Sequence, residues 1–340
     1  MIPEEKTAAV TRGLREAFGV EQYEDIRLLA KSATALVYRI VVQGTPYLLR
    51  IITRIGESSC QGHFIAMRAA AEAGLAPKVW YTSLPDRVCI TDFVAAVPFS
   101  QQEALVRMPA VLHGLHALPP FPAREPHLNT SCTFLLFAGE AKTELIRSFE
   151  KTELLSVQDK AELLARYAEL AGIYPQDGDE VVSSHNDLVK PDNFLFDGNR
   201  VWVVDWEAAT PNDRYADLAV VANFVTNSEP EEKAFLEGYF GRPAEPYELA
   251  RLFLMRQIAH IFYTMAYLLL SSSGNPVSGE EAVPGFQEFH HRIWAGEVDF
   301  KDPKMKLAYG KVHWNQLQGN VQTPRYAEAL RIVADRHRSR

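Results

Sequence analysis

The pattern of apolar and polar positions divides the chain into a strand-rich first part and a helix-rich second part. An amphipathic helix is predicted at residues 4–18, and another at 58–73 is ended by Gly74. Short runs rich in Val, Ile, Leu and Tyr, which predict strands, lie at 26–30, 36–42, 47–52, 78–82 and 87–93. The first part is therefore expected to be a small mixed unit of strands and helices.

After Phe93 the periodicity becomes mainly helical. Helices are predicted at 103–116, 133–149, 157–171 and 246–270. Pro109 is expected to kink or split the first of these. One hairpin interrupts the helical pattern, with its turn at residues 197–199, and the Ser/Gly/Pro-rich stretch 271–285 is predicted to be a loop.

These patterns predict an α+β fold with a small mixed lobe at 1–93, a hinge at 94–98 and a larger, mainly helical lobe at 99–340. A chain of 340 residues is long enough for two lobes. The 35 basic and 43 acidic residues give a net charge of −8. This balance argues against a general nucleic-acid-binding protein, which would carry a basic stripe.

Other features exclude further classes of protein. The 3 cysteines are scattered, without the spacing of a zinc site or a disulfide framework. The N-terminus holds acidic residues and no apolar core, so no signal peptide is expected. The most apolar stretch, 258–270, is too short to span a bilayer and predicts a buried helix. We therefore expect a cytoplasmic protein without membrane or nucleic-acid partners; its oligomeric state is unknown from the sequence.

Residues 183–207 hold the first two of the three kinds of group that phosphoryl transfer requires. That reaction needs a carboxylate for the attacking hydroxyl, oxygen ligands for Mg²⁺ and a cation for the phosphates. Asp187 follows an apolar-to-polar transition and is expected in a loop, and Asp205 ends the apolar strand predicted at 201–204. An acid at the end of such a strand is held rigidly, as a metal ligand should be.

The segments HNDLVKPDNFLF and VWVVDWE resemble the aminoglycoside phosphotransferase and choline/ethanolamine kinase superfamily, whose hallmark is HxDxxxxN followed by a strand and an Asp. With NDRYADLA downstream, the chain is most similar to the bacterial choline-kinase-like branch. The resemblance covers most of the chain and implies a protein-kinase-like two-lobe fold. It also implies a Mg-dependent phosphotransferase that uses ATP, with GTP left open. The acceptor would be the hydroxyl of a small-molecule alcohol, either a choline- or ethanolamine-like amino alcohol or an aminoglycoside-like compound.

By this resemblance Asp187 is the catalytic base, and Asn193 and Asp205 are the Mg²⁺ ligands. The hallmark places five residue steps between base and asparagine, whereas Asn193 follows Asp187 by six. Either the loop has one extra residue, or Asp192 binds the metal instead, since Mg²⁺ accepts both oxygen types. Asn193 is preferred because the following Phe-Leu-Phe keeps the family's strand register.

The nucleotide-binding residues are expected in the first lobe. Arg50, in the strand YLLRII, would hold the phosphates with its bidentate guanidinium. The preceding loop has no glycine, so Ser32 and Thr34 would contact phosphates through backbone and hydroxyl groups. By resemblance alone, the backbone at Asp92 and Val94 would bind adenine.

The helix predicted at 58–73 lacks, in its middle, the glutamate that usually pairs with the phosphate-binding cation, and Gln61 or His63 occupies that region. With the missing glycines, this favours an alternative function: a nucleotide-binding pseudokinase that acts as a regulatory or interaction module.

On the acceptor side, a quaternary amine is held by aromatic faces and carboxylates. Trp206, Glu207 and Tyr263 are the candidates for this role, although Trp and Tyr at helical spacing are more often core residues.

Overall fold

The computed structural model describes residues 2–32, 34–53, 57–123, 139–175, 178, 180–188, 193–272 and 282–338. The chain packs as two compact units. The first unit contains the chain up to Phe99, a segment from Gly114 onward, and Ser183–Pro211. The second contains Ser100–His113 and the remaining helices. The segment of the predicted chemistry therefore packs with the N-terminal part of the chain.

A five-stranded antiparallel sheet is the frame of the first unit. Its strands are β1 (Asp25–Lys31), β2 (Ala35–Val42), β3 (Thr45–Ile52), β4 (Val79–Ser83) and β5 (Val88–Asp92). They lie in the order β1-β2-β3-β5-β4, and each neighbouring pair is antiparallel. All five strands were predicted from the apolar runs, because a strand that buries one face repeats its apolar residues every second position.

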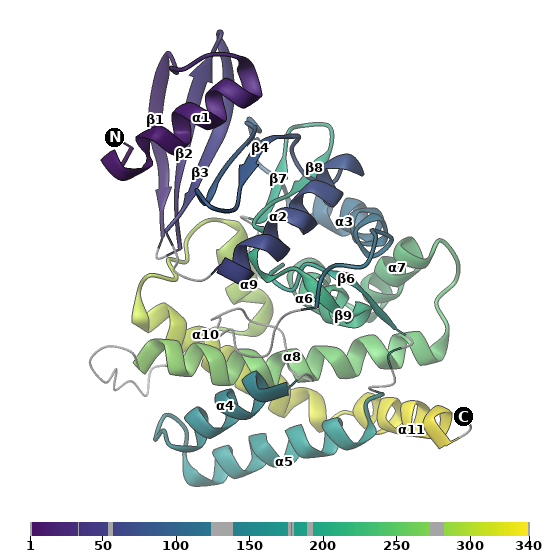
Figure 1. The fold of residues 1–340 in the computed structure, drawn as a ribbon. Helices are drawn as coiled ribbons and strands as arrows, with labels where there is room; N and C mark the ends of the chain where they lie inside the picture. Colours follow the sequence, from purple (N-terminus) through teal and green to yellow (C-terminus); the bar gives the residue numbers. More distant parts are fainter. Residues whose placement is uncertain are drawn as a thin grey trace. The chain divides into compact units, whose positions relative to one another are not determined.

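The helix α1 (Thr7–Phe18) lies across one face of this sheet (Figure 1). A 3₁₀ turn, η1 (Glu4–Lys6), precedes it, so the regular α-helix begins later than the sequence predicted. Val10 and Leu14 of α1 are buried in one core with Ile40 of the sheet. Gly13 permits close packing here, because a Cβ atom at this position would lie 2.8 Å from the ring of Tyr81.

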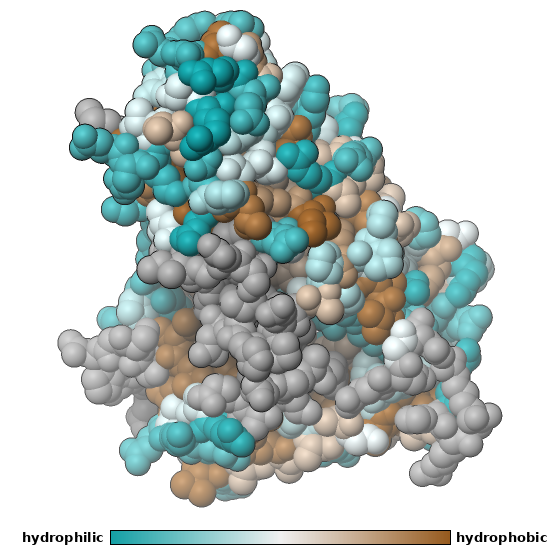
Figure 2. All heavy atoms as spheres, viewed as in Figure 1, coloured by the Kyte–Doolittle hydropathy of each residue, from teal (hydrophilic) through white to brown (hydrophobic). Residues whose placement is uncertain are grey.

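The surface of the first unit is mostly hydrophilic on the face that Figure 2 shows. Several large apolar side chains of this unit are nevertheless exposed, among them Leu28, Leu29, Ile65 and Val97. Apolar side chains of this kind are normal on protein surfaces.

Main-chain hydrogen bonds connect the segment Ser183–Pro211, which holds the predicted catalytic residues, to the rest of the first unit. The strands β7 (Phe194–Phe196) and β8 (Val201–Val203) form the predicted hairpin, with Phe196 opposite Val201. The N–H of Val97 donates to the carbonyl of Phe196 at 2.7 Å, and the N–H of Val203 donates to the carbonyl of Leu75 at 2.8 Å. Leu75 follows α2 (Glu57–Glu72), so the hairpin is held beside the end of that helix.

The second unit is built from helices. They are α3 (Gln101–His116), α4 (Gly139–Glu150), α5 (Val157–Ile173), α6 (Arg214–Val225), α7 (Glu229–Phe240), α8 (Pro246–Ser272), α9 (Phe286–Trp294), α10 (Pro303–Val321) and α11 (Pro324–Arg338). The last residues of α3 belong to the first unit. The α+β class predicted from the sequence, with a sheet followed by helices, is confirmed.

Some details of the helices differ from the prediction. The helix α3 continues through Pro109 as one element, so the predicted split is wrong. The helix predicted at 133–149 lies partly outside the described residues, and its described part is α4. Of the predicted loop 271–285, residues 273–281 lie outside the described chain, while its first two residues belong to α8.

The helix α8 is long and apolar enough to cross a membrane by length and composition alone. However, 83% of its most apolar window is buried inside the protein, as in the core helix of a folded domain. The buried helix expected at 258–270 is therefore present. Its length and composition are also those of a membrane span, but its burial is that of a core helix.

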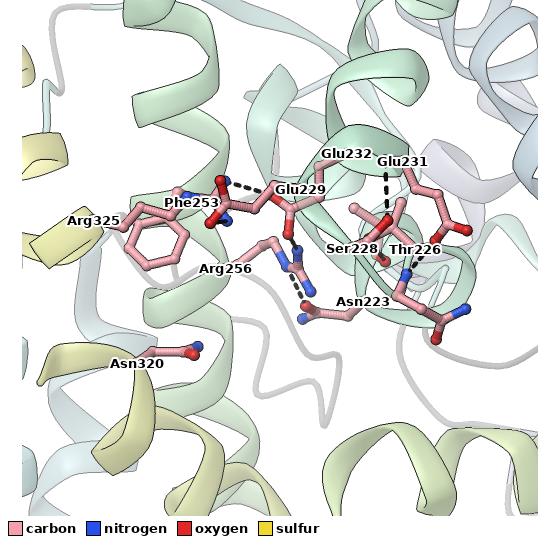
Figure 3. Close-up of polar contacts among 12 residues, drawn as sticks. Asn223, Thr226, Ser228, Glu229, Glu231, Glu232, Phe253, Arg256, Asn320 and Arg325 are labelled. Atoms are coloured by element: carbon pink, nitrogen blue, oxygen red, sulfur yellow. Dashed lines mark hydrogen bonds and ion pairs between the residues drawn. The ribbon is translucent and has the colours of Figure 1, made fainter. Parts of the chain in front are cut away.

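A buried charge cluster connects α7, α8 and α11 in the second unit (Figure 3). The Glu232 carboxylate, 8% exposed, is paired with Arg256 and Arg325. Nε of Arg256 also donates to Oδ1 of Asn223 at 2.7 Å, and the Arg325 guanidinium lies 4.3 Å from the ring centre of Phe253. One buried carboxylate thus balances two guanidinium groups, whose side chains are 12% (Arg256) and 26% (Arg325) exposed.

Replacing Glu232 with glutamine should destabilise the protein by about 3–5 kcal/mol, because it leaves Arg256 without its buried counter-charge and removes one of the two carboxylate partners of Arg325. Urea unfolding would measure this loss. Glu229→Gln is the matched control: Glu229 lies on the same helix and contacts Arg325 at 3.5 Å, but it is 71% exposed. Its loss should be under about 1 kcal/mol. Equal losses in the two variants would contradict the assignment.

Three buried histidines lie among aromatic rings of α8, α9 and α10. Nδ1 of His260 and Nδ1 of His313 are 2.9 Å apart, so one ring donates to the other. His290 hydrogen-bonds the carbonyl of Phe286 at 2.8 Å and the hydroxyl of Tyr309 at 3.2 Å. Burial lowers the pKa of His290 to about 4, and it lowers the pKa values of His260 and His313 as well. All three rings are therefore neutral at neutral pH.

Acidification should destabilise the protein through these histidines. Their folded-state pKa values lie below the unfolded value, so their contribution is complete above about pH 6.5 and is lost as the pH falls towards the folded values. For His290 the loss is about 2 kcal/mol at about pH 5. Unfolding free energies measured between about pH 7.5 and about pH 5 should fall more steeply for the native chain than for His290→Gln. Parallel pH profiles would refute this account.

Candidate active site

The loop after β6 (Val181–Ser184) is fixed by two buried side chains. Nε2 of His185 lies 3.0 Å from the carbonyl of Val204, and its ring packs against that of Trp206. His185 thus braces the loop against the strand end that precedes Asp205.

Asn186 gives the loop its sharp bend. Its φ angle is +64°, a left-handed conformation that Asn adopts more readily than most residues. Its side-chain amide donates to the carbonyl of Ala208 at 3.1 Å and to Oγ1 of Thr210 at 3.0 Å. These bonds stabilise the strained backbone immediately before Asp187.

Asp187 and Asn193 lie together on either side of the undescribed residues 189–192. Nδ2 of Asn193 donates to the main-chain carbonyl of Asp187 at 2.6 Å, and Oδ2 of the Asp187 carboxylate is 3.5 Å from the same amide. The Asp187 side chain is half-buried, whereas Asn193 is buried. The alternative ligand, Asp192, lies outside the described residues.

Asp205 follows β8 and also has a left-handed backbone, with φ +68°. The turn η3 (Trp206–Ala208) comes next. A side chain at the end of a strand, held by a strained backbone between a strand and a turn, has a defined direction. Because non-glycine residues with positive φ gather at functional sites, Asn186 and Asp205 mark this part of the fold.

Arg50 on β3 extends to the same place. Nη2 lies 3.0 Å from Oδ1 of Asp205, and it is also paired with the Glu207 carboxylate. Burial opposes the charge of Arg50, but the negative charges of Asp205 and Glu207 outweigh it and raise the pKa of Arg50. Burial likewise opposes the charge of Asp205, and the charge of Arg50 reverses that effect, so the pKa of Asp205 is lowered. Both groups are therefore charged at neutral pH.

Arg50 has carboxylate partners although α2 does not supply the glutamate that usually pairs with this cation. They come from the DWE triplet, more than 150 positions away in the sequence. Of the two residues expected in the glutamate's place on α2, Gln61 is exposed and His63 is buried. Burial, and then the charge of Arg50, lower the pKa of His63 to about 3, so its ring is neutral.

A cavity of about 400 Å³ joins these residues to the sheet. Its lining comes from three sources: the sheet, α2 with the chain that follows it, and the hairpin with the turn after it. Among the lining residues are Leu29, Val37, Arg50, His63, Thr91, Asp92, Phe93, Val94, Asn193, Asp205 and Trp206. The cavity is large enough for a small molecule and has an apolar part and a charged part.

The structure brings most of the predicted nucleotide and metal residues to this cavity. Arg50, Asp92, Val94, Asn193 and Asp205 all line it. The Asp92 carboxylate accepts a hydrogen bond from Nε1 of Trp80 at 2.7 Å, so its side chain is already engaged. The main chain is also partly engaged, since the N–H of Asp92 donates to the carbonyl of Lys78 at 2.9 Å and the carbonyl of Val94 accepts from the N–H of Ala96 at 3.0 Å. The adenine contacts of Asp92 and Val94 stay a prediction.

Ser32 and Thr34 lie in the turn between β1 and β2. Oγ of Ser32 accepts hydrogen bonds from the N–H groups of Thr34 at 3.2 Å and Ala35 at 3.0 Å. A serine side chain thus stabilises the turn in a loop without glycine. The phosphate contacts of Ser32 and Thr34 stay a prediction.

The residues predicted for the acceptor occupy different environments. Trp206 is 1% exposed, and its Nε1 donates to the carbonyl of Val203 at 3.2 Å. Tyr263 is also buried, in the aromatic core of the second unit. Glu207 is partly exposed and paired with Arg50. Packing roles account for both rings, and the acceptor role of all three residues stays a prediction.

The donor set of the cavity fits Mg²⁺. The Asp205 carboxylate and the Asn193 side-chain carbonyl are hard oxygen ligands, and both face the same cavity. Within the described ranges, no group of three or more His, Cys, Asp or Glu side chains could hold a metal. Mg²⁺ needs fewer, because it binds one or two carboxylates together with waters and phosphate oxygens.

Two features of this site were not predicted from the sequence. Asn186 was read only as part of the family motif, although an Asn before a functional Asp is itself a signal for a left-handed turn. The pairing of Glu207 with Arg50 had no local signal, because it depends on tertiary contact.

The chain is similar in sequence to known proteins. Residues 25–252 match the model of a family described as the phosphotransferase enzyme family. One curated relative, the protein LicA homolog of Mycoplasma capricolum subsp. capricolum, is 29% identical over 91 residues. The aligned part is 27% of this chain and 38% of that relative, so the chain matches well under half of its length.

Solved structures share the fold. A choline/ethanolamine kinase family protein from Mesorhizobium loti has a TM-score of 0.66 at 21% identity, and the match covers 97% of this chain and 99% of the other. The ternary complex of APH(2″)-IIa with streptomycin and ATP has a TM-score of 0.55 at 14% identity, with 79% of this chain and 91% of the other covered. These likenesses establish a protein-kinase-like fold.

Proposed function

Because the chain belongs to the phosphotransferase enzyme family, we propose that it transfers the γ-phosphoryl group of ATP to the hydroxyl of a small alcohol. The observation that carries the proposal is the meeting of Arg50, Asn193 and Asp205 at one cavity, with Asn193 also bonded to the loop of Asp187. These are the cation, metal ligands and carboxylate that phosphoryl transfer uses.

The roles follow from the chemistry of each side chain. Asp187 orients the acceptor hydroxyl and takes its proton as the oxygen attacks the γ-phosphorus, while the bond to the bridging oxygen breaks and ADP leaves. Asn193 and Asp205 would hold Mg²⁺, which when bound neutralises charge on the phosphates. Arg50 binds phosphate oxygens with a forked guanidinium. Catalysis is then mainly positioning and electrostatic stabilisation.

Choline- or ethanolamine-like amino alcohols are the proposed acceptors, with aminoglycoside-like compounds as the second class. The resemblance of the HNDL and DWE segments to the choline-kinase-like branch supports the first class, and the fold shared with the streptomycin-bound structure supports the second. The pseudokinase alternative is not favoured, because Asp205 and Glu207 supply the carboxylate partners of Arg50. A cytoplasmic location stays a prediction.

An ADP-release assay over amino alcohols, aminoglycosides and sugars tests the proposal. We expect acceptor-dependent ADP release with at least one member of the first two classes, and none without Mg²⁺. Normal binding of Mg²⁺–ATP without turnover on any compound would overturn it and favour the pseudokinase.

A further inference from the structure

Among the described side chains of α2, His63 is the polar one that lines the cavity. It is 3% exposed and lies beside Arg50 and Asp205, whose charges act directly on its ring. Its position is therefore the charged part of the cavity, where the phosphates of a nucleotide would lie if the proposed function holds.

Among the residues that the structure describes, neither ring nitrogen of His63 has a partner in hydrogen-bond geometry. The backbone of Trp206 approaches the ring and raises its pKa as a hydrogen-bonding group would, but this contact lies outside hydrogen-bond geometry. The buried rings of His185, His260, His290 and His313 each make at least one hydrogen bond. Because buried polar groups are almost always paired, a buried histidine with two unpaired nitrogens that faces a cavity needs an explanation.

A bound ligand supplies the missing partner. An imidazole ring offers at least one N–H donor in either protonation state. A phosphate oxygen accepts the N–H, and such a bond to a charged acceptor is stronger than one between neutral groups. A phenylalanine or leucine would pack as well in this position without leaving polar atoms unpaired.

We propose that His63 is a nucleotide-binding residue, which donates a hydrogen bond to the polyphosphate from the helix position where related folds place a glutamate. This inference rests on the proposed function. It assigns to α2 a direct contact with the ligand, whereas the glutamate of related folds acts through the cation.

The test compares His63→Leu and His63→Gln in the full chain. Calorimetry would measure the dissociation constant of Mg²⁺–ADP, and thermal unfolding without nucleotide would measure stability. We expect His63→Leu to weaken Mg²⁺–ADP binding by about tenfold or more while the ligand-free melting temperature stays equal or rises. His63→Gln keeps an N–H donor and should remain within about threefold of the native chain. Gln61→Leu, an exposed change on the same helix, should alter neither quantity.

Native affinity in His63→Leu, or the same loss in both His63 variants, would overturn the inference, because the imidazole N–H would then not be the contact. If His63→Leu does not fold, His63→Met takes its place with the same criteria. Failure of the native chain to bind Mg²⁺–ADP would instead remove the proposed function itself.

Discussion

Replacing Asp187 with asparagine should lower kcat by a factor on the order of 10²–10⁴ and leave the affinity for Mg²⁺–ADP almost unchanged. The carboxylate is the proposed proton acceptor, and asparagine has nearly its shape without its basicity. The loop should keep its conformation, because the Asn193 amide donates its shorter hydrogen bond to the main-chain carbonyl of residue 187, which the substitution does not change.

Steady-state rates and nucleotide binding measured on the same preparation would separate catalysis from folding. Asp25→Asn is a suitable control, because this aspartate is 66% exposed and its recorded ion-pair partner is Arg39 on the neighbouring strand, at 3.6 Å. It should leave kcat unchanged. A kcat within about threefold of native in Asp187→Asn would refute the role of Asp187 as base.

The second large effect is expected at Asp205. Asp205→Asn removes the only carboxylate among the two proposed metal ligands, so kcat/KM should fall by about 10²–10³ and the Mg²⁺ concentration for half-maximal rate should rise. The change also removes one of the two partners of Arg50. A loss of activity alone would therefore not distinguish metal binding from the support of Arg50.

Glu207→Gln makes that distinction, because Glu207 is also paired with Arg50 but is not a proposed metal ligand. Both variants should weaken the binding of nucleotide by Arg50. Only Asp205→Asn should raise the Mg²⁺ concentration that gives the half-maximal rate. Titration of the rate with Mg²⁺ in both variants provides the comparison. The same shift in both, or in neither, would contradict the assignment of Asp205 as a ligand.

The sequence was most informative where function is carried by neighbouring residues. The proposed base, the preferred asparagine ligand and the strand-end aspartate lie within one short segment, and the hairpin predicted there is present. Asn193 and Asp205 line the same cavity, and the catalytic roles of the three residues stay predictions. Arg50 was predicted from the resemblance of YLLRII to the family's strand pattern, and its side chain lines the cavity. Local spacing is therefore a good guide to this part of the molecule.

Contacts between distant segments were outside the reach of such reasoning. The pairing of Glu207 with Arg50 and the burial of His63 arise only when β3, α2 and the DWE turn meet. The buried cluster of Glu232, Arg256 and Arg325 joins three helices that carry no common motif. Charged residues are usually exposed, so their sequence positions gave no sign of this burial.

The most direct test of the account follows the phosphate itself. Phosphorus NMR of the native chain with Mg²⁺, ATP and choline or ethanolamine, followed by an aminoglycoside, would identify where the γ-phosphoryl group goes. The account predicts a new phosphomonoester signal that grows as the ATP signals decline, and that is absent with Asp187→Asn. Release of inorganic phosphate alone, or a phosphomonoester formed equally well by Asp187→Asn, would contradict it.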